Sequence, residues 1–283
     1  MSDISEQNEP GPMTGLIQHE PGVLVIRNIN WAGMGALYMK EVRRFMKVQL
    51  QTIWAPAVTT LLYLVIFTLA LGRGGITVMG APFADFVAPG LIVMGMIQNA
   101  YQNASFSLLA GKMQGTIVDF LMPPVSAGEL LFALVASSMT RAILVGFAIW
   151  GAMLLWPGVS VMPAHPWAAL WFGLMGTAML AFIGVLTSIW AEKFDHAAAV
   201  ANFVVTPLSL LSGTFYSMDH VAPLFRQISH ANPFFYAISG FRYGFLAQAD
   251  SPVALGAAVL LAVNLVLAFI CYRALARGWK IKA

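Results

Sequence analysis

The segment Leu211–Leu246 (LSGTFYSMDHVAPLFRQISHANPFFYAISGFRYGFL) decides how this chain folds, and it lies between the last two long apolar runs. Pro223, Pro233 and several charges prevent it from crossing a bilayer as one helix, yet it is too apolar for an ordinary loop. Non-helical backbone at membrane depth is tolerated only where it is buried in protein or lines a water-filled cavity. We therefore expect an outward re-entrant helical hairpin that faces other protein or a translocation path.

The composition is that of an integral membrane protein. Charged residues make up 10% of the 283 residues and hydrophobic residues 59%, whereas soluble domains carry about 25% charged residues. The single cysteine, Cys271, excludes an internal disulfide and a cysteine-based metal site. The basic residues lie beside the membrane segments, so the net charge of +3 does not indicate a nucleic-acid partner. The first apolar run starts near Thr52, too late for a secretory signal, so no cleavage is expected.

Six apolar segments approach the ~20 residues that a membrane helix requires. They are expected at 52–71, 86–110, 129–156, 167–190, 198–215 and 253–272. Residues 1–28 lack periodicity and are interpreted as a flexible cytoplasmic tail, and residues 29–283 as one transmembrane domain. An even number of spans puts both termini on one side, and the excess of lysine and arginine there indicates the cytoplasm. The predicted fold class is an all-α polytopic membrane protein with six transmembrane helices.

Ahead of the first span, residues 30–48 form an amphipathic pattern. At about 3.6 residues per turn, an apolar stripe lies opposite a cationic face. The stripe comprises Trp31, Met34, Tyr38, Val42 and Phe45, and the cationic face comprises Lys40, Arg43, Arg44 and Lys47. We expect a helix in the cytoplasmic interface, with its aromatic residues at the acyl boundary and its cations toward lipid phosphates. It either anchors the chain alone or also packs against a cytosolic partner.

A short capped helix is expected in the cytoplasmic loop between the second and third spans. Thr116 and Asp119 have capping-box spacing, and Pro123-Pro124 end the helix. The expected helix comprises Thr116, Ile117, Val118, Asp119, Phe120, Leu121 and Met122. Ser126 and Glu129 repeat the capping arrangement at the start of the third span. The helix is either a simple connector or a docking site, and a docked partner would cover its apolar face.

No nucleotide-binding or catalytic motif occurs in the sequence. Gly111-Lys112 lacks the upstream glycine and the following Ser or Thr of a phosphate-binding loop. The five histidines are scattered, so neither a metal site nor enzymatic activity is predicted. The acidic residues that flank the spans fall at segment ends, where water can reach them, which does not favour ion coupling. They are Asp85, Glu129, Glu192, Asp195 and Asp250.

Two groups of polar residues lie inside the spans. The second span carries four amides in two pairs spaced by four, Gln98, Asn99, Gln102 and Asn103. A polar face in the membrane must meet protein or water. The amides either join helices, at about 1 kcal/mol per hydrogen bond, or line a cavity. The second group is a single residue, Arg141, inside the third span. Three outcomes are open for it: its side chain snorkels to the cytoplasmic interface, it pairs within the chain, or it lines a cavity for an anionic substrate.

The re-entrant segment Leu211–Leu246 would form the outer end of a translocation path through the membrane. Gly213 and Gly240 permit close backbone approach where the chain turns and returns. Arg242 is expected at the outer interface, with Asp219 or a lipid phosphate as its counter-charge. An aromatic collar is expected around the exit, formed by Phe215, Tyr216, Phe234, Phe235 and Tyr236.

Four stretches in this order resemble the membrane subunit of type-2 ABC exporters, and more narrowly the YadH-like permeases. They are KEVRRFMKVQLQTIWAP at 40–56, APGLIVMGMIQNAYQN at 88–103, FVVTPLSLLSGTFYS at 203–217 and NPFFYAISGFRYGFL at 232–246. The resemblance covers most of the chain from Lys40 onward. The chain departs from the family pattern at Gly111–Gln114, which lacks the acidic residue often found before the coupling helix.

This resemblance implies a role for each part. The amphipathic helix would be the connecting helix, residues 116–122 the coupling helix that docks on a cytosolic ABC ATPase, and the hairpin the outward gate. It also implies a homodimer in the lipids of the bacterial inner membrane, served by two ATPase copies that bind ATP and Mg. No cofactor is then expected in this chain, and it would not itself be an enzyme.

The substrate of such a machine would be lipid-like, amphipathic or drug-like, and it would move out of the cytoplasm. One alternative is export of a polysaccharide or lipid-linked oligosaccharide by the same machine. Another is an ion-coupled carrier or a structural membrane protein without an ATPase.

Overall fold

The computed structural model describes residues 29–71, 77–118, 124–156, 158–218 and 222–279. Six of the described helical segments are long and apolar enough to cross a membrane, which confirms the predicted number of spans. The tail 1–28 lies outside the described residues.

The first span combines a π-helical turn η1 (Leu50–Trp54) with α2 (Ala55–Leu71). The second, third and fourth spans are α3 (Phe83–Met113), α5 (Ala127–Leu154) and α6 (Pro166–Trp190). The fifth is α7 (Phe194–Val200), π-helical η3 (Ala201–Val205) and α8 (Thr206–Leu211), and the sixth is α11 (Val253–Ala276). The fifth ends at Leu211 rather than near Phe215, because Gly213 turns the chain with a φ of 77°.

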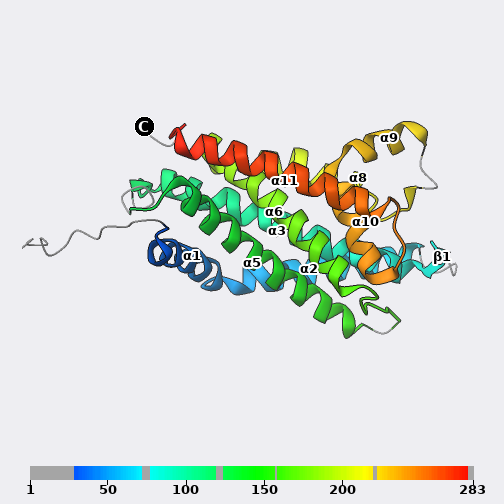
Figure 1. The fold of residues 1–283 in the computed structure, drawn as a ribbon. Coiled ribbons are helices and arrows are strands. Elements are labelled where there is room, and N and C mark those ends of the chain that lie inside the picture. Colours follow the sequence, from blue (N-terminus) through cyan, green and yellow to red (C-terminus); the bar gives the residue numbers. More distant parts are fainter. Residues whose placement is uncertain (1–28, 72–76, 119–123, 157, 219–221, 280–283) are drawn as a thin grey trace, which may run out of the picture.

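The spans run alongside one another, with both ends of the described chain at the same end of the bundle (Figure 1). Helix α3 lies at the centre: its most apolar window is 89% buried, against 17% for α11 and the fifth span and 22% for the first span. Small residues allow the close packing around α3. A Cβ on Gly184 of α6 would lie 2.7 Å from the Tyr101 carbonyl oxygen of α3, so only glycine fits there.

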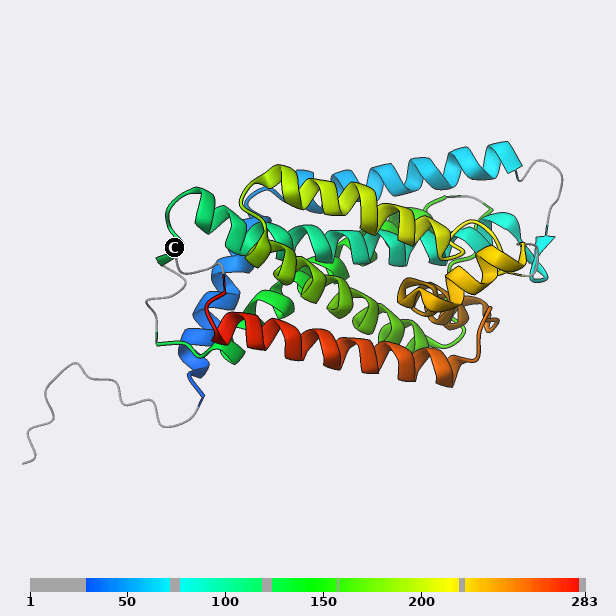
Figure 2. The same cartoon turned by 90° about the horizontal axis from the view of Figure 1, so that it is seen from above.

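The N-terminal helix α1 (Trp31–Met46) lies across the end of the bundle, as Figure 2 shows. Asn30 caps it by accepting a hydrogen bond from the Gly33 amide at 2.8 Å. Its apolar stripe packs against α5 rather than facing lipid, since Phe45 is buried and Tyr38 is half-buried. Trp31 is the exception at 69% exposure.

Two short helices fill the segment before the last span, α9 (Pro223–Ala231) and α10 (Pro233–Leu246). Helix α9 is mostly exposed, whereas α10 packs against α3, α6 and α11. The all-α prediction misses one small element, a β-hairpin between the first two spans. Its strands β1 (Thr77–Val78) and β2 (Ala81–Pro82) pair antiparallel around a turn with positive φ at Met79 and Gly80.

Glycines spaced by four bring α10 onto α6. A Cβ on Gly240 would lie 2.2 Å from the Phe172 ring, and one on Gly244 would lie 2.6 Å from the Ala169 backbone nitrogen. Small residues at this spacing let two membrane helices approach closely. The position of α10, and therefore of every side chain that it carries, depends on this contact.

We predict that Gly244→Ala will lower the stability of the folded permease by about 1–3 kcal/mol, because the new methyl overlaps backbone that cannot move aside. Gly35→Ala in α1 is the matched control, since no atom lies within 4 Å of its Cβ position. The control should be neutral or stabilising by up to about 1 kcal/mol. Thermal unfolding in detergent measures both, and equal melting temperatures for the two variants would contradict the packing account.

Candidate functional site

A buried ion pair lies at the end of the bundle that carries α9 and α10. The guanidinium of Arg242, in α10, donates to Asp250 Oδ2 at 2.8 Å, and the two side chains are 0% and 2% exposed. Removal of either partner would leave an isolated charge in a dry site, which is costly. The pair therefore fixes the loop before α11 against α10.

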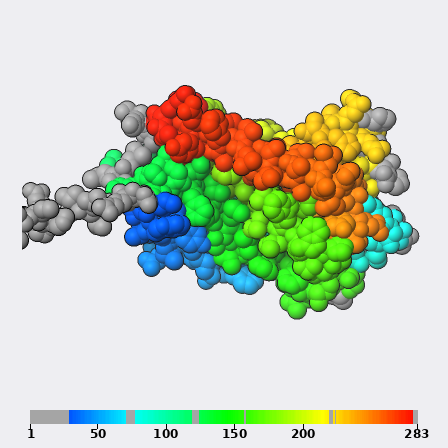
Figure 3. Space-filling view, in the orientation of Figure 1, coloured from blue at the N-terminus to red at the C-terminus, as the bar shows by residue number. Residues whose placement is uncertain are grey.

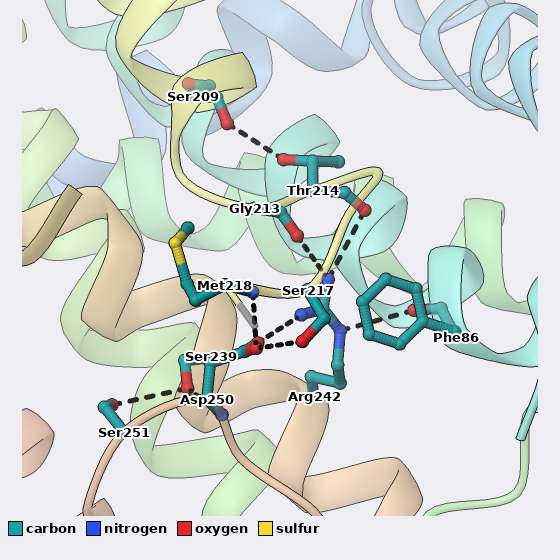
Figure 4. Close-up of polar contacts among 10 residues, drawn as sticks. All are labelled: Phe86, Ser209, Gly213, Thr214, Ser217, Met218, Ser239, Arg242, Asp250 and Ser251. Carbon is teal, nitrogen blue, oxygen red and sulfur yellow. Dashed lines mark hydrogen bonds and ion pairs between the residues drawn. The ribbon is translucent and has the colours of Figure 1, made fainter. Parts of the chain in front are cut away.

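Arg242 also joins two further parts of the chain (Figure 4). Its Nη2 donates to the carbonyls of Gly213 at 2.6 Å and Thr214 at 3.3 Å, and its Nε donates to the Phe86 carbonyl at 3.3 Å. Its planar group also lies over the Phe86 ring, 3.9 Å from the centroid. One side chain thus holds α3, the turn after α8, α10 and the loop before α11 together.

Asp250 makes further hydrogen bonds through both its carboxylate and its backbone amide. Its Oδ1 accepts from the Ser217 hydroxyl at 3.0 Å and from the Met218 amide at 3.1 Å. Its own amide donates to the Ser239 hydroxyl oxygen at 3.0 Å. The carboxylate therefore holds Ser217 and Met218, in the segment that links α8 to α9, against the loop before α11.

These contacts correct two expectations from the sequence. Arg242 is fully buried, so it meets no lipid phosphate, and its counter-charge is Asp250. The Asp250 side chain, which was expected to be open to water, is only 2% exposed. Asp219, the expected counter-charge, lies outside the described residues. The available signal was an acidic residue eight positions after an arginine that lies in an apolar segment.

The expected aromatic collar is also wrong for the residues of α10. Phe234, Phe235 and Tyr236 are buried among the helices of their own chain. Phe215 and Tyr216 are half-buried, with the Phe215 ring 4.2 Å from that of Phe67. These rings therefore pack the hairpin against the spans and do not surround an opening within this chain.

A second polar cluster lies nearer the opposite end, where α1 crosses α3 and α5. Arg44 pairs with Glu41 at 2.9 Å and donates to the backbone and side-chain oxygens of Asn103, each at 3.2 Å. Asn103 donates in turn to the Ser138 hydroxyl at 3.1 Å. Arg44 was expected to face lipid phosphates, but it turns inward and ties α1 to α3.

Glu41 is a residue that the sequence reasoning missed. It is 1% exposed and lies on the face of α1 that buries Leu37 and Phe45. A carboxylate four residues before Phe45 interrupts an apolar stripe, and this spacing was the available signal. The exposed cations here are Lys40 and Arg43 of α1 and Lys47 directly after it.

Arg141 of α5 pairs within the chain, one of the three outcomes considered from the sequence. It is 9% exposed and donates to Asn99 Oδ1 at 2.9 Å, while its Nε atom has no hydrogen-bond partner. Asn99 donates to the Gly95 carbonyl at 2.9 Å. No carboxylate among the described residues lies within ion-pair distance of Arg141.

The four amides of α3 therefore divide into two faces. Asn99 and Asn103 are buried against α1 and α5, where they join helices. Gln98 is half-buried and Gln102 is exposed, so these two point away from the helices that hold the asparagines. Only the glutamines remain candidates for lining a pathway.

The start of α5 connects to the start of α1. Ser126 and Glu129 form the predicted capping box, with both reciprocal hydrogen bonds present. Glu129 also accepts from the Asn30 amide at 2.6 Å, and the Asn30 side chain donates to the Pro124 carbonyl at 3.1 Å. Glu129 is thus buried and bonded rather than open to water, and it ties α1 to the loop between α3 and α5.

Of the expected coupling helix, only the first part is described. The Thr116 amide donates to the Gly111 carbonyl at 2.8 Å, and Ile117 packs against the core. Asp119, Phe120, Leu121 and Met122 lie outside the described residues. In the described part of the chain, no three His, Cys, Asp or Glu side chains gather as metal ligands would.

Comparison with known proteins assigns the chain to a family. The sequence model described as ABC-2 type transporter matches residues 33–246. The inner membrane transport permease YadH of Escherichia coli (strain K12) is 34% identical over 252 residues, which cover 89% of this chain and 97% of that protein. Nodulation protein J of Rhizobium leguminosarum bv. viciae is 27% identical over 257 residues, covering 88% and 94% of the two chains.

Six membrane-capable helices among the described residues define a multi-pass membrane protein. More narrowly, the chain belongs to the ABC-2 type transporter family, as the membrane-embedded permease of an ABC transporter in the inner membrane. The family resemblance read from the sequence is thereby confirmed.

We predict that Asp250→Asn will destabilise the permease by about 3–5 kcal/mol, because it leaves the buried guanidinium of Arg242 without a counter-charge. A double variant, Arg242→Met with Asp250→Leu, removes both charges and should recover part of this loss. Recovery should be incomplete, since the Gly213, Thr214 and Phe86 carbonyls lose their donor. Melting temperatures of the two variants in detergent test this order, and an unchanged Asp250→Asn protein would contradict it.

Proposed function

We propose that two copies of this chain assemble as the membrane part of an ATP-driven exporter. Two copies of a separate cytosolic ABC ATPase would bind and hydrolyse ATP with Mg. The cargo would be lipid-like, amphipathic or drug-like, and it would leave the cytoplasm along a pathway between the two permease chains. Membership of the ABC-2 type transporter family supports the division between permease and ATPase.

The proposed pathway rests on two amides of α3, the half-buried Gln98 and the exposed Gln102. Gln98, Gln102 and Phe106 are spaced by four and so form one column on α3. Phe106 stacks on Phe194 of α7 at 5.1 Å, which puts this column beside the fifth span. Uncovered amides facing hydrocarbon would be costly, so the column should meet a second copy or a water-filled path.

The spans on this side have surface available for a partner. The first and fifth spans are the least buried apart from α11, and each contains a π-helical turn. Turns of this kind occur often at functional sites. Large apolar side chains project from both turns, with Leu50 76% and Phe203 82% exposed.

The contacts at the other end suggest how ATPase movement would reach the spans. A partner that moves residues 116–122 would pull on α1 and α5 through Asn30 and Glu129. Arg44 would carry that movement into α3 through Asn103, and Tyr38 would carry it into α5, since its hydroxyl lies 2.9 Å from that of Thr140. The amphipathic helix α1 would then transmit movement of the ATPase to α3 and α5.

The proposed orientation puts both termini in the cytoplasm, where the excess of lysine and arginine lies. The hairpin of α9 and α10 would then form the outward gate, held by Arg242. Export of a glycan is less favoured, because the hairpin rings Phe234, Phe235 and Tyr236 are buried and cannot form an aromatic belt for sugars.

We predict that Gln98→Leu with Gln102→Leu will leave insertion and stability unchanged while efflux of a fluorescent amphipathic dye falls at least fivefold. The change makes α3 more apolar and removes no contact to α1 or α5. Asn103→Leu is the contrast: it should lower the melting temperature, because Arg44 and Ser138 lose their partner. Wild-type efflux in the glutamine variant would remove these residues from the pathway.

We predict that Phe120→Asp will prevent the ATPase from co-purifying with the permease, because it would put a charge into an apolar docking contact. Leu224→Asp in α9 is the control, since it adds the same charge to an exposed residue of a helix that the proposed docking does not involve. The control should retain the ATPase, and both variants should insert and dimerise as the wild type does. Equal recovery of the ATPase with all three proteins would refute docking through this helix.

A further inference from the structure

A cavity of about 360 Å³ lies among α3, α5, α6 and α10. Its deep wall includes Met96 of α3, Gly146 of α5, Gly173 of α6 and Phe241 of α10. The two glycines let neighbouring side chains approach closely: a Cβ on Gly146 would lie 2.7 Å from the Met96 sulfur, and one on Gly173 would lie 3.2 Å from the Phe241 ring. Phe241 precedes the buried Arg242, so the cavity lies directly behind the helix that carries the ion pair.

The lining offers nothing to water. Its residues are aliphatic, aromatic, proline, glycine or methionine. The one polar side-chain group among these lining residues is the indole N–H of Trp150, and it already donates to the Val161 carbonyl at 2.7 Å. A buried water needs two or more polar partners, and a void without water leaves its walls without contacts. The natural filling is therefore hydrocarbon.

The mouth of the cavity opens where the membrane supplies hydrocarbon. Phe147 of α5 and Leu170 of α6 border it, and they are 61% and 63% exposed. Both helices are membrane-capable spans. Figure 3 shows that the green helices form much of one face of the molecule, below α11.

One end of the cavity carries the side chains of a membrane–water interface. Pro163 and Pro166 line this end, and His165 between them stacks on Tyr243 at 4.9 Å. Trp167, 61% exposed, lies edge-on to the same tyrosine at 6.3 Å. Amphipathic rings of this kind concentrate at head-group depth. The cavity thus runs from head-group depth toward the middle of the span.

We propose that one acyl chain of a membrane phospholipid occupies this cavity, with its head group beside Trp167 and Tyr243. The chain would fill the space between α5 and α6 and support α10 from behind. The proposal requires only that the protein spans the membrane, and it does not depend on the exporter mechanism or on the cargo.

The test uses the full chain in nanodiscs that contain a phospholipid with a photoactivatable diazirine near the end of one acyl chain. After illumination, peptide mass spectrometry locates the adducts. Lipid that only surrounds the protein would label exposed positions such as Phe269, which is 61% exposed. A chain inside the cavity would also label Met96 and Phe241, which are 8% and 5% exposed.

We predict adducts on Met96 and Phe241 at a yield at least equal to that on Phe269. Leu174→Trp enlarges a half-buried side chain of the lining. It should reduce the adduct yield on Met96 and Phe241 at least fivefold and leave the yield on Phe269 unchanged. Leu265→Trp is the matched control, because Leu265 is 63% exposed on α11 and lies away from the cavity.

Three results would overturn the proposal. One is labelling confined to exposed positions in the wild-type protein, a readout that holds even if Leu174→Trp fails to fold. A second is the absence of adducts on Phe147 and Leu170 at the mouth, which would show that a second copy of the chain keeps lipid out. Labelling of Met96 and Phe241 that Leu174→Trp does not reduce would equally contradict occupancy of this cavity.

Discussion

A guanidinium without access to water must have its donors satisfied within the protein, and Arg242 imposes that requirement on much of this fold. Its contacts reach Asp250 in one direction and the Phe86 carbonyl, 156 residues away, in the other. Gly213 must take a positive φ so that its carbonyl can meet the same group. Gly240 and Gly244 must remain glycines so that α10 lies close enough to α6 to present the arginine. A single buried charge thus explains why four distant segments have the conformations observed.

Polar clusters tie both ends of the bundle, and between them close apolar packing is joined by a few buried hydrogen bonds, such as that from Arg141 to Asn99. At one end Arg242 and Asp250 fix the hairpin, and at the other Arg44, Asn103 and Glu129 fix α1 to the spans. The first and fifth spans take little part in either cluster and keep most of their surface uncovered. The chain therefore consists of a firmly connected core, α3 with α5, α6 and α10, and of peripheral spans that are freer to change their contacts.

Local features were predictable from the sequence, and tertiary contacts were not. The capping box of Ser126 and Glu129 depends on residues three apart, and each span depends on a continuous apolar run, so both could be read directly. Helical periodicity put the amides of α3 on a polar face, but it could not say that α1 and α5 cover Asn99 and Asn103 while Gln102 stays open. The partner of Arg242 was missed for the same reason, since Asp250 meets it only after the intervening loop folds back.

The amides of α3 also bear on how the protein is made. Together with the fifth span, α3 is among the least apolar of the six, yet it is the most buried. A helix with this composition gains little from leaving the translocon alone, because its amides would meet lipid. Arg44 is synthesised before α3, but Ser138 and Arg141 follow it. Stable integration of α3 should therefore wait until α5 has been synthesised. The second and third spans would then enter the bilayer together rather than one after the other.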